Sequence, residues 1–244
     1  MKLIHLIVAF SLVLACPLRG SLSFTQASTN KVTVANPLTY GSGTTTTYVM
    51  WIKQRATPNA SEGWSKAVLN NIFVYSGVSL TWRQLIDRAT TDADSRVLNS
   101  LIFPNLNEWR FVGITYSEGN GVKIYYGGLN TTVAEASDYV TQTVGAGATN
   151  ADTSDLYVGN RSSTDTLAPA HDIAFFALYD TELTLGELRV QQFSQRPIKA
   201  GCKTLFVMGA SGTTTQVDWS GNAKNSTITG ASVAAHAPLP PPLR

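Results

Sequence analysis

Residues 109–128 read WRFVGITYSEGNGVKIYYGG, and this stretch decides the fold. On both sides of its centre, β-branched and aromatic residues follow one another with the alternation that a pleated, half-buried strand requires. Between the two runs, Glu118-Gly119-Asn120-Gly121 is a strong turn signal. The stretch therefore predicts a β-hairpin in which residues 109–116 pair with residues 122–126.

The composition of the chain excludes two classes of protein. Only 14% of the 244 residues are charged, against about 25% in an average soluble protein, and 29 are threonine. Because threonine favours strands and few runs of helix-forming residues remain, coiled coils and helical bundles are excluded. The formal net charge is only +2, without a cluster of lysines and arginines, which excludes a nucleic-acid binder that acts through bulk charge.

Residues 1–20 are a signal-like or anchoring apolar segment. Met1-Lys2 precedes an apolar run from Leu3 to Ala15, shorter than the roughly 20 residues of a membrane span. Such a run is typical of a secretory signal, and LVLAC at residues 12–16 resembles a bacterial lipobox in which Cys16 would carry the lipid. Cleavage, lipidation and retention as an apolar arm all stay open. We expect a secreted or surface-anchored protein, or alternatively a virion-associated one, that meets a membrane only through this segment.

The rest of the chain reads as short strands separated by polar turns. Residues 22–24 and 31–34 resemble a hairpin, and Asp172–Tyr179 is apolar enough for a central strand buried on both faces. Asp138–Asp155 predicts a long loop or an irregular edge. Thr184 and Glu187 have the spacing of a capping box, which predicts one short helix near 184–193. The proline-rich residues 234–244 predict an extended tail.

These stretches resemble the laminin-G-like jelly rolls of the concanavalin A-like lectin/glucanase superfamily. The resemblance rests on the hairpin at 109–128, SLSF at 21–24, YVMWIK at 48–53, LYVGN at 156–160 and the run from Ile173 to Leu188. It implies an all-β, two-sheet antiparallel jelly-roll sandwich. Trp219-Ser220-Gly221-Asn222, which such domains usually carry at their start, stands here near the end. Because the termini of a sandwich lie close together, we expect one jelly roll over residues 21–233, with a truncated tandem repeat as the alternative.

The same resemblance bears on catalysis. The hydrolases of this superfamily carry paired acids on one strand face, Glu-x-Asp-x-Glu or a close variant, and the chain has no such run. A serine or cysteine triad needs a histidine base, and only His171 and His236 follow the signal-like segment. We expect His171 to begin a strand and the protein not to be an enzyme. A glycanase remains only if acids from separate strands converge.

No cofactor is firmly predicted, although calcium is a candidate. Many laminin-G-like domains bind calcium through oxygen ligands at a rim. The acidic residue that often follows the position of Ile173 in this family is Ala174 here. Asp152, Asp155 and Asn160 form an alternative candidate cluster, and a solvated polar loop is the other interpretation of these residues.

A carbohydrate site needs an aromatic platform beside hydrogen-bonding groups. We single out Trp82 with Arg83, Asp87 and Tyr75, together with the more loop-like Trp64. A core or rim position is the alternative for each aromatic residue. Three other tryptophans are expected in the core: Trp51, Trp109 and Trp219.

The sequence therefore predicts a non-catalytic, lectin-like module that is exposed on a cell surface or particle and binds a carbohydrate or glycoconjugate. The alternative is a structural virion or appendage subunit that uses the sandwich to contact neighbouring subunits. Low charge and extended termini suit either function.

Overall fold

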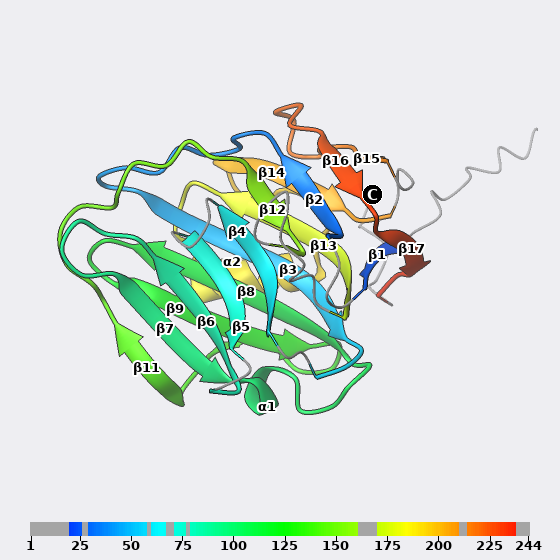
Figure 1. The fold of residues 1–244 in the computed structure, drawn as a ribbon, viewed down its shortest axis with the longest axis horizontal. Helices are drawn as coiled ribbons and strands as arrows, with labels where there is room; N and C mark the ends of the chain where they lie inside the picture. The colour runs from blue at the N-terminus through cyan, green and yellow to red at the C-terminus, as the bar shows by residue number, and fades with distance from the viewer. Residues whose placement is uncertain are drawn as a thin grey trace, which may run out of the picture.

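Two antiparallel sheets, A and B, face each other in the computed structural model, which describes residues 20–25, 29–57, 60–66, 71–76, 79–160, 170–209 and 214–237 (Figure 1). Sheet A contains β1 (Gly20–Phe24), β3 (Thr45–Gln54), β8 (Trp109–Ser117), β9 (Gly121–Gly128), β10 (Ala134–Glu135), β13 (His171–Tyr179), β14 (Cys202–Val207) and β17 (Ser232–Ala235). Sheet B contains β2 (Lys31–Val34), β4 (Ala60–Lys66), β5 (Asn71–Ser76), β6 (Thr81–Ile86), β7 (Ala93–Leu98), β11 (Tyr139–Thr143), β12 (Leu156–Val158), β15 (Thr215–Gln216) and β16 (Ser226–Thr229).

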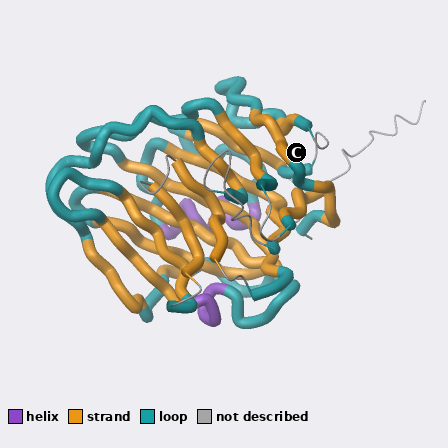
Figure 2. The backbone as a smooth tube through the Cα atoms, viewed as in Figure 1, coloured by secondary structure: helices purple, strands orange, loops and turns teal. Residues whose placement is uncertain are grey.

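The strand order is that of a sandwich in which the chain passes repeatedly from one sheet to the other. Sheet A runs β10-β9-β8-β3-β13-β1-β17, with β14 also paired to β13, and sheet B runs β11-β7-β6-β5-β4-β12-β2-β16-β15. Figure 2 shows that strands make up most of both layers and that the helices are short. The all-β, two-sheet antiparallel sandwich is confirmed.

The predicted hairpin at 109–128 is β8 and β9. The two strands pair in continuous register from Arg110 opposite Gly128 to Ser117 opposite Gly121. Gly121 has a φ of +69°, a left-handed conformation that glycine adopts without steric cost, and this explains the glycine at the end of the turn.

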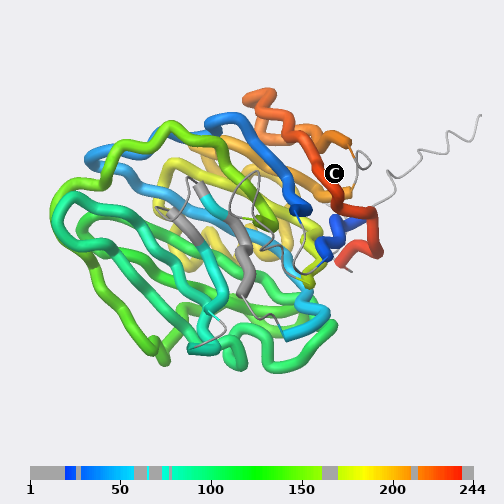
Figure 3. Tube along the Cα trace, viewed as in Figure 1, coloured from blue at the N-terminus to red at the C-terminus, as the bar shows by residue number. Residues whose placement is uncertain are grey.

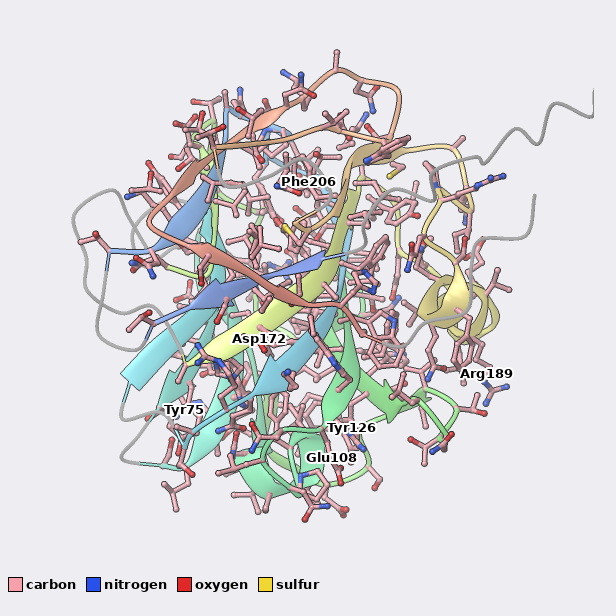
Figure 4. All side chains as sticks on the ribbon, turned by 90° about the vertical axis from the view of Figure 1, so that its right-hand side faces the viewer. Tyr75, Glu108, Tyr126, Asp172, Arg189 and Phe206 are labelled. Carbon is pink, nitrogen blue, oxygen red and sulfur yellow. The ribbon has the colours of Figure 1, made fainter. Side chains whose placement is uncertain are left out.

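Sheet A is covered on both faces, and each face has its own core. Between the sheets lie the inner faces of β3, β8 and β13, including Met50, Val112 and Phe176. On the opposite face, a second core includes Trp51 and Leu188. Figure 4 shows the helix that carries Arg189 on the side of sheet A away from Tyr75 of sheet B. Strand β13 is buried along its whole length, as predicted.

That helix is α2 (Leu185–Phe193), and it begins where the sequence predicts. The Thr184 side chain accepts a hydrogen bond from the Glu187 backbone, and the Glu187 side chain accepts one from the Thr184 backbone, which completes the capping box. A second helix, α1 (Asn99–Ile102), was not predicted, because a single turn is too short to show a helical period.

The two ends of the described chain lie side by side. Strand β1 pairs with β17 from Gly20 opposite Ala235 to Ser23 opposite Ser232, and Figure 3 shows the blue and red segments together. Strands β14 to β17 extend both sheets. The predicted hairpin of residues 22–24 and 31–34 is wrong: β1 pairs with β13 and β17, whereas β2 pairs with β12 and β16 in the other sheet.

The two terminal segments that the sequence analysis singled out lie largely outside the residues that the structure describes. Residues 1–19, with Cys16, and residues 238–244 are not among the described residues, so their cleavage, lipidation or contacts stay predictions. Within the described part of the chain, no helix has the length and apolar character to cross a membrane. Residues 139–143, inside the predicted loop or irregular edge, form the edge strand β11, whose register shifts between Tyr139 and Thr141.

Candidate functional site

Trp82, the first residue singled out for a glycan site, lies in the core between the sheets. Its side chain is fully buried and stacks on Phe73, with 4.7 Å between ring centroids and 20° between ring planes. Its indole N–H donates to Asn99 Oδ1 over 2.8 Å. Tyr75, directly opposite Trp82 on β5, is equally enclosed. Neither ring has a face that a ligand could reach. Both residues are therefore core aromatics, which was the alternative interpretation of each.

Arg83 leaves the strand on the opposite face from Trp82, because neighbouring strand residues point to opposite sides of a sheet. It lies directly across from Arg96, and Asp94 joins the two guanidinium groups, with 2.9 Å to Arg83 Nε and 2.8 Å to Arg96 Nη2. Burial raises the pKa of Asp94, but the hydrogen bonds from Arg96 and Arg83 outweigh this effect and hold the pKa below its usual range. Asp87 follows β6, and its carbonyl accepts from the Asn150 amide. The predicted residues thus do not form one surface.

Trp64 lies in β4, opposite Phe73, and not in a loop as predicted. Its side chain is outside the described residues, so its part in a glycan site stays a prediction.

Two of the three calcium candidates, Asp152 and Asp155, accept hydrogen bonds from backbone amides. Asp152 Oδ1 accepts from the Ser154 amide at 2.8 Å, and Asp155 Oδ1 accepts from the Asn36 amide at 3.2 Å. Asn160 is fully buried. In the described part of the chain, no three His, Cys, Asp or Glu side chains come together in a way that could hold a metal ion.

His171 is the first residue of β13, as predicted, and it is enclosed by aromatic rings. Its ring meets Trp82 edge-on at 5.6 Å and Phe103 at 5.8 Å between centroids. Burial, with a smaller contribution from the Arg55 charge, lowers the pKa of His171 to about 3. The imidazole is therefore neutral at physiological pH, but no substrate can reach it without opening the core.

The exposed tryptophan of the described chain lies elsewhere, on the loop of residues 217–224, here called the Trp219 loop. The side chain of Trp219 is 55% exposed, whereas Trp51, Trp82 and Trp109 are at most 9% exposed. The prediction that Trp219 lies in the core is wrong.

Asp218 fixes the Trp219 loop against β14. One of its carboxylate oxygens accepts from the Leu205 and Ser220 amides, and the other accepts from the Lys224 amide and the Ser220 hydroxyl, all between 2.8 and 2.9 Å. The Trp219 amide in turn donates to the Leu205 carbonyl over 2.8 Å. The loop therefore hydrogen-bonds to the edge of β14 that does not pair with β13, and it holds the Trp219 backbone in one place while the indole remains in solvent.

The same loop contributes polar groups to a neighbouring hollow of about 400 Å³. The residues lining this hollow are Asn36, Pro37, Leu38, Thr39, Asp180, Lys203, Asn222 and Lys224. Asn222 is fixed by a 2.7 Å hydrogen bond to the Cys202 carbonyl, and Lys203 forms a 2.6 Å ion pair with Asp180. The Trp219 loop thus carries an exposed aromatic ring and contributes the amide of Asn222 and the ammonium of Lys224 to a hollow that neighbours it. An aromatic ring near such polar groups is the chemistry that recognises hydroxylated rings.

The comparisons with known proteins identify the fold. No family model and no curated protein matches the sequence. A candidate carbohydrate-binding protein from Bacteroides ovatus is similar in structure, with a TM-score of 0.64 and 14% identity over 92% of this chain. The heptameric SAP-like pentraxin of Limulus polyphemus has a TM-score of 0.54 and 13% identity, over 90% of this chain and 96% of its own. The chain has a concanavalin A-like jelly-roll fold. This jelly roll spans only 62% of the length of the Bacteroides protein.

The sequence did contain a signal for the position of Trp219 in the jelly roll. Asp218, Ser220, Gly221 and Asn222 surround it, and all four are turn-forming residue types. Gly221 has a φ of +91°, which confirms a turn at that point. A tryptophan inside a turn sequence is more exposed than one inside an alternating strand, and this distinction would have separated Trp219 from Trp82.

Proposed function

We propose that the protein binds a carbohydrate, without cleaving it, at the Trp219 loop. The observation that carries this proposal is the exposed indole of Trp219 on a backbone that Asp218 fixes by four hydrogen bonds. A sugar ring has an apolar face that stacks on an aromatic side chain, and a rim of hydroxyl groups that hydrogen-bonds to amides and charged groups. Because the loop is already ordered by these bonds, little conformational entropy is lost on binding.

The fold supports the same proposal by analogy, since the Bacteroides protein of the same fold is itself a candidate carbohydrate-binding protein.

The environment of the acidic and basic groups supports binding without catalysis. Asp94 is held by two arginines, and Asp172 is held by Lys53 at 2.8 Å and Arg55 at 3.0 Å. The hydrogen bonds from Arg96 and Arg83 hold the pKa of Asp94 below its usual range, whereas a general acid needs a raised pKa. His171, enclosed by aromatic rings, has no route to a substrate.

A glycan array tests the proposal with the wild-type protein and two variants. Trp219→Ala removes the platform, and Phe193→Ala, which truncates a 41%-exposed side chain on α2, is the matched control. We expect the wild type and Phe193→Ala to retain the same glycans and Trp219→Ala to lose at least tenfold in affinity. Unchanged binding by Trp219→Ala would contradict the proposal. A wild type that binds no glycan but sediments as an oligomer would favour the structural-subunit alternative.

A further inference from the structure

A second hollow, of about 420 Å³, lies at the opposite end of the jelly roll. Its lining residues are Asn107, Glu108, Trp109, Arg110, Gly128, Leu129, Asn130 and Thr131. Figure 4 shows Glu108 at the lower end of the molecule and Phe206 of β14, along which the Trp219 loop runs, near the upper end. The two hollows are therefore separate sites.

Arg110 is the cationic group of this hollow, and it occupies a position of the strand that otherwise faces the apolar core. It lies opposite Ile52, a residue of the core between the sheets, and two residues before Val112, which belongs to the same core. The Arg110 side chain therefore leaves β8 on the inner face, at the end where the sandwich meets solvent.

The charge of Arg110 lacks an anionic partner. The side chain is half-buried, and its buried Nε has no hydrogen-bond partner. Among the described residues, the ion pairs are made by other lysines and arginines, not by Arg110. Burial lowers the pKa of Arg110, and the nearby Glu108 only partly offsets this effect. A half-buried cation without a partner is unfavourable, and an anion in the hollow would relieve the cost.

Gly128 gives the guanidinium its space. It lies directly opposite Arg110, and a β-carbon at this position would come within 3.2 Å of Arg110 Nη1 and 3.0 Å of Thr131 Oγ1. The absence of a side chain at Gly128 lets Arg110 Nη1 lie close to the backbone of β9, where both residues line the hollow.

We propose that this hollow binds the carboxylate of an acidic sugar, with Arg110 on the carboxylate and Asn107, Asn130 and Thr131 beside the sugar hydroxyls. A guanidinium matches a carboxylate through two parallel hydrogen bonds, and the amide and hydroxyl groups provide donors and acceptors for a hydroxylated ring. The sugar part of this assignment rests on the proposed function, whereas the carboxylate part rests on Arg110 alone.

Glu108 is the group that opposes an anion in this hollow. It is exposed, and its Oε1 accepts a 2.8 Å hydrogen bond from Asn105 Nδ2. Its charge weakens the attraction of Arg110 for a carboxylate without removing it, because Glu108 makes no ion pair with Arg110. Neutralising Glu108 should therefore strengthen binding, a gain that damage to the fold could not produce.

The test is a calorimetric titration of the full chain with glucuronate, glucose and acetate at low and high salt. Glucuronate and glucose share a ring and differ in one carboxylate, whereas acetate carries the carboxylate without the ring. We expect glucuronate to bind more tightly than glucose or acetate, and we expect the affinity for glucuronate to fall as the salt concentration rises. Arg110→Gln should lose at least tenfold, Gly128→Ala should weaken binding, and Glu108→Gln should improve it severalfold. Arg189→Gln, an exposed arginine of α2, is the matched control.

Each contrary result overturns a defined part of the proposal. Equal binding of glucuronate and glucose, or full binding by Arg110→Gln, would contradict the carboxylate assignment. Equal binding of acetate and glucuronate would contradict the sugar assignment. Trp219→Ala should bind glucuronate like the wild type, so failure of the Trp219 site and failure of the Arg110 site can be told apart.

Discussion

Trp82 and Trp219 are held in opposite ways. Trp82 is fixed by its side chain: aromatic rings surround the indole, and its N–H donates to Asn99. Trp219 is fixed by its backbone, because Asp218 and the Leu205 carbonyl hold the loop while the indole stays in solvent. Trp82 therefore contributes to stability, whereas the indole of Trp219 is accessible to another molecule.

The largest expected effect separates the two residues by stability. Trp82→Ala should lower the free energy of unfolding by about 3–5 kcal/mol, because it leaves a cavity and removes the donor to Asn99 Oδ1. Trp219→Ala should change it by no more than about 0.5 kcal/mol, since its side chain is mostly in solvent. Urea denaturation of both variants measures the contrast. An equal loss of stability in the two variants would contradict the distinction between a core tryptophan and an exposed one.

The pH dependence of stability provides a second test of how the core around Trp82 is packed. The pKa of His171, beside Trp82, falls from an ordinary 6.5 to about 3 on folding. The unfolded chain therefore binds the proton more readily, so stability is lost as the pH falls below about 6.5 and continues to fall toward 3. The expected loss is about 3 kcal/mol between pH 7 and pH 4.

His171→Leu tests this assignment by urea denaturation at several pH values. Leucine cannot bind a proton, so the variant should lose much less stability between pH 7 and pH 4. The lowered pKa values of Asp94, Glu118 and Glu187 act in the lower part of this window, as the pH approaches their ordinary values of 3.8 and 4.5, so a smaller loss of stability below about pH 5.5 should remain in the variant. A pH dependence that survives unchanged in His171→Leu would show that another group is responsible.

Asp218→Ala tests the backbone that holds Trp219. The substitution removes the acceptors of the Leu205, Ser220 and Lys224 amides and should cost about 1–3 kcal/mol of stability. Glycan affinity should fall as well, because the loop no longer holds the indole in place. Wild-type affinity in a destabilised Asp218→Ala would mean that the order of the loop is irrelevant to binding.

The smallest effect is expected at Arg83, which the sequence grouped with Trp82. Its ion pair with Asp94 is partly exposed, with 30% of the arginine side chain accessible, and such pairs contribute about 0–1 kcal/mol. Arg83→Gln should therefore change stability little and leave the glycan-array profile unchanged. If Arg83→Gln lost the array signal, the glycan site would have to lie on the outer face of sheet B, around Arg83.

Local patterns were enough to predict the elements with strong periodicity. The hairpin β8–β9, the buried strand β13 and the capped helix α2 each carry their signal within a few residues. The pairing of β1 and β2 was not predictable in this way, because their apolar residues would suit a hairpin as well as two strands that face each other across the core. Only the long-range partners β13, β17, β12 and β16 decide between these arrangements.

The site was less predictable than the fold for a related reason. Trp82 and Tyr75 are adjacent to polar residues in sequence, yet strand alternation turns them away from Arg83 and into the core. Arg110 looked like an ordinary member of an alternating strand, and only the position of Gly128 across from it reveals the hollow.

The most direct test of the central claim is to follow the indole N–H signals of the protein by ¹⁵N NMR during titration with cello-, laminari- and manno-oligosaccharides, with each signal assigned by a Trp→Phe variant. We predict that the Trp219 signal shifts with saccharide concentration while the Trp82 signal, hydrogen-bonded to Asn99 in the core, stays in place. A saccharide that moves the Trp82 or Trp64 signal and leaves that of Trp219 unchanged would contradict the assignment of the binding surface to the Trp219 loop.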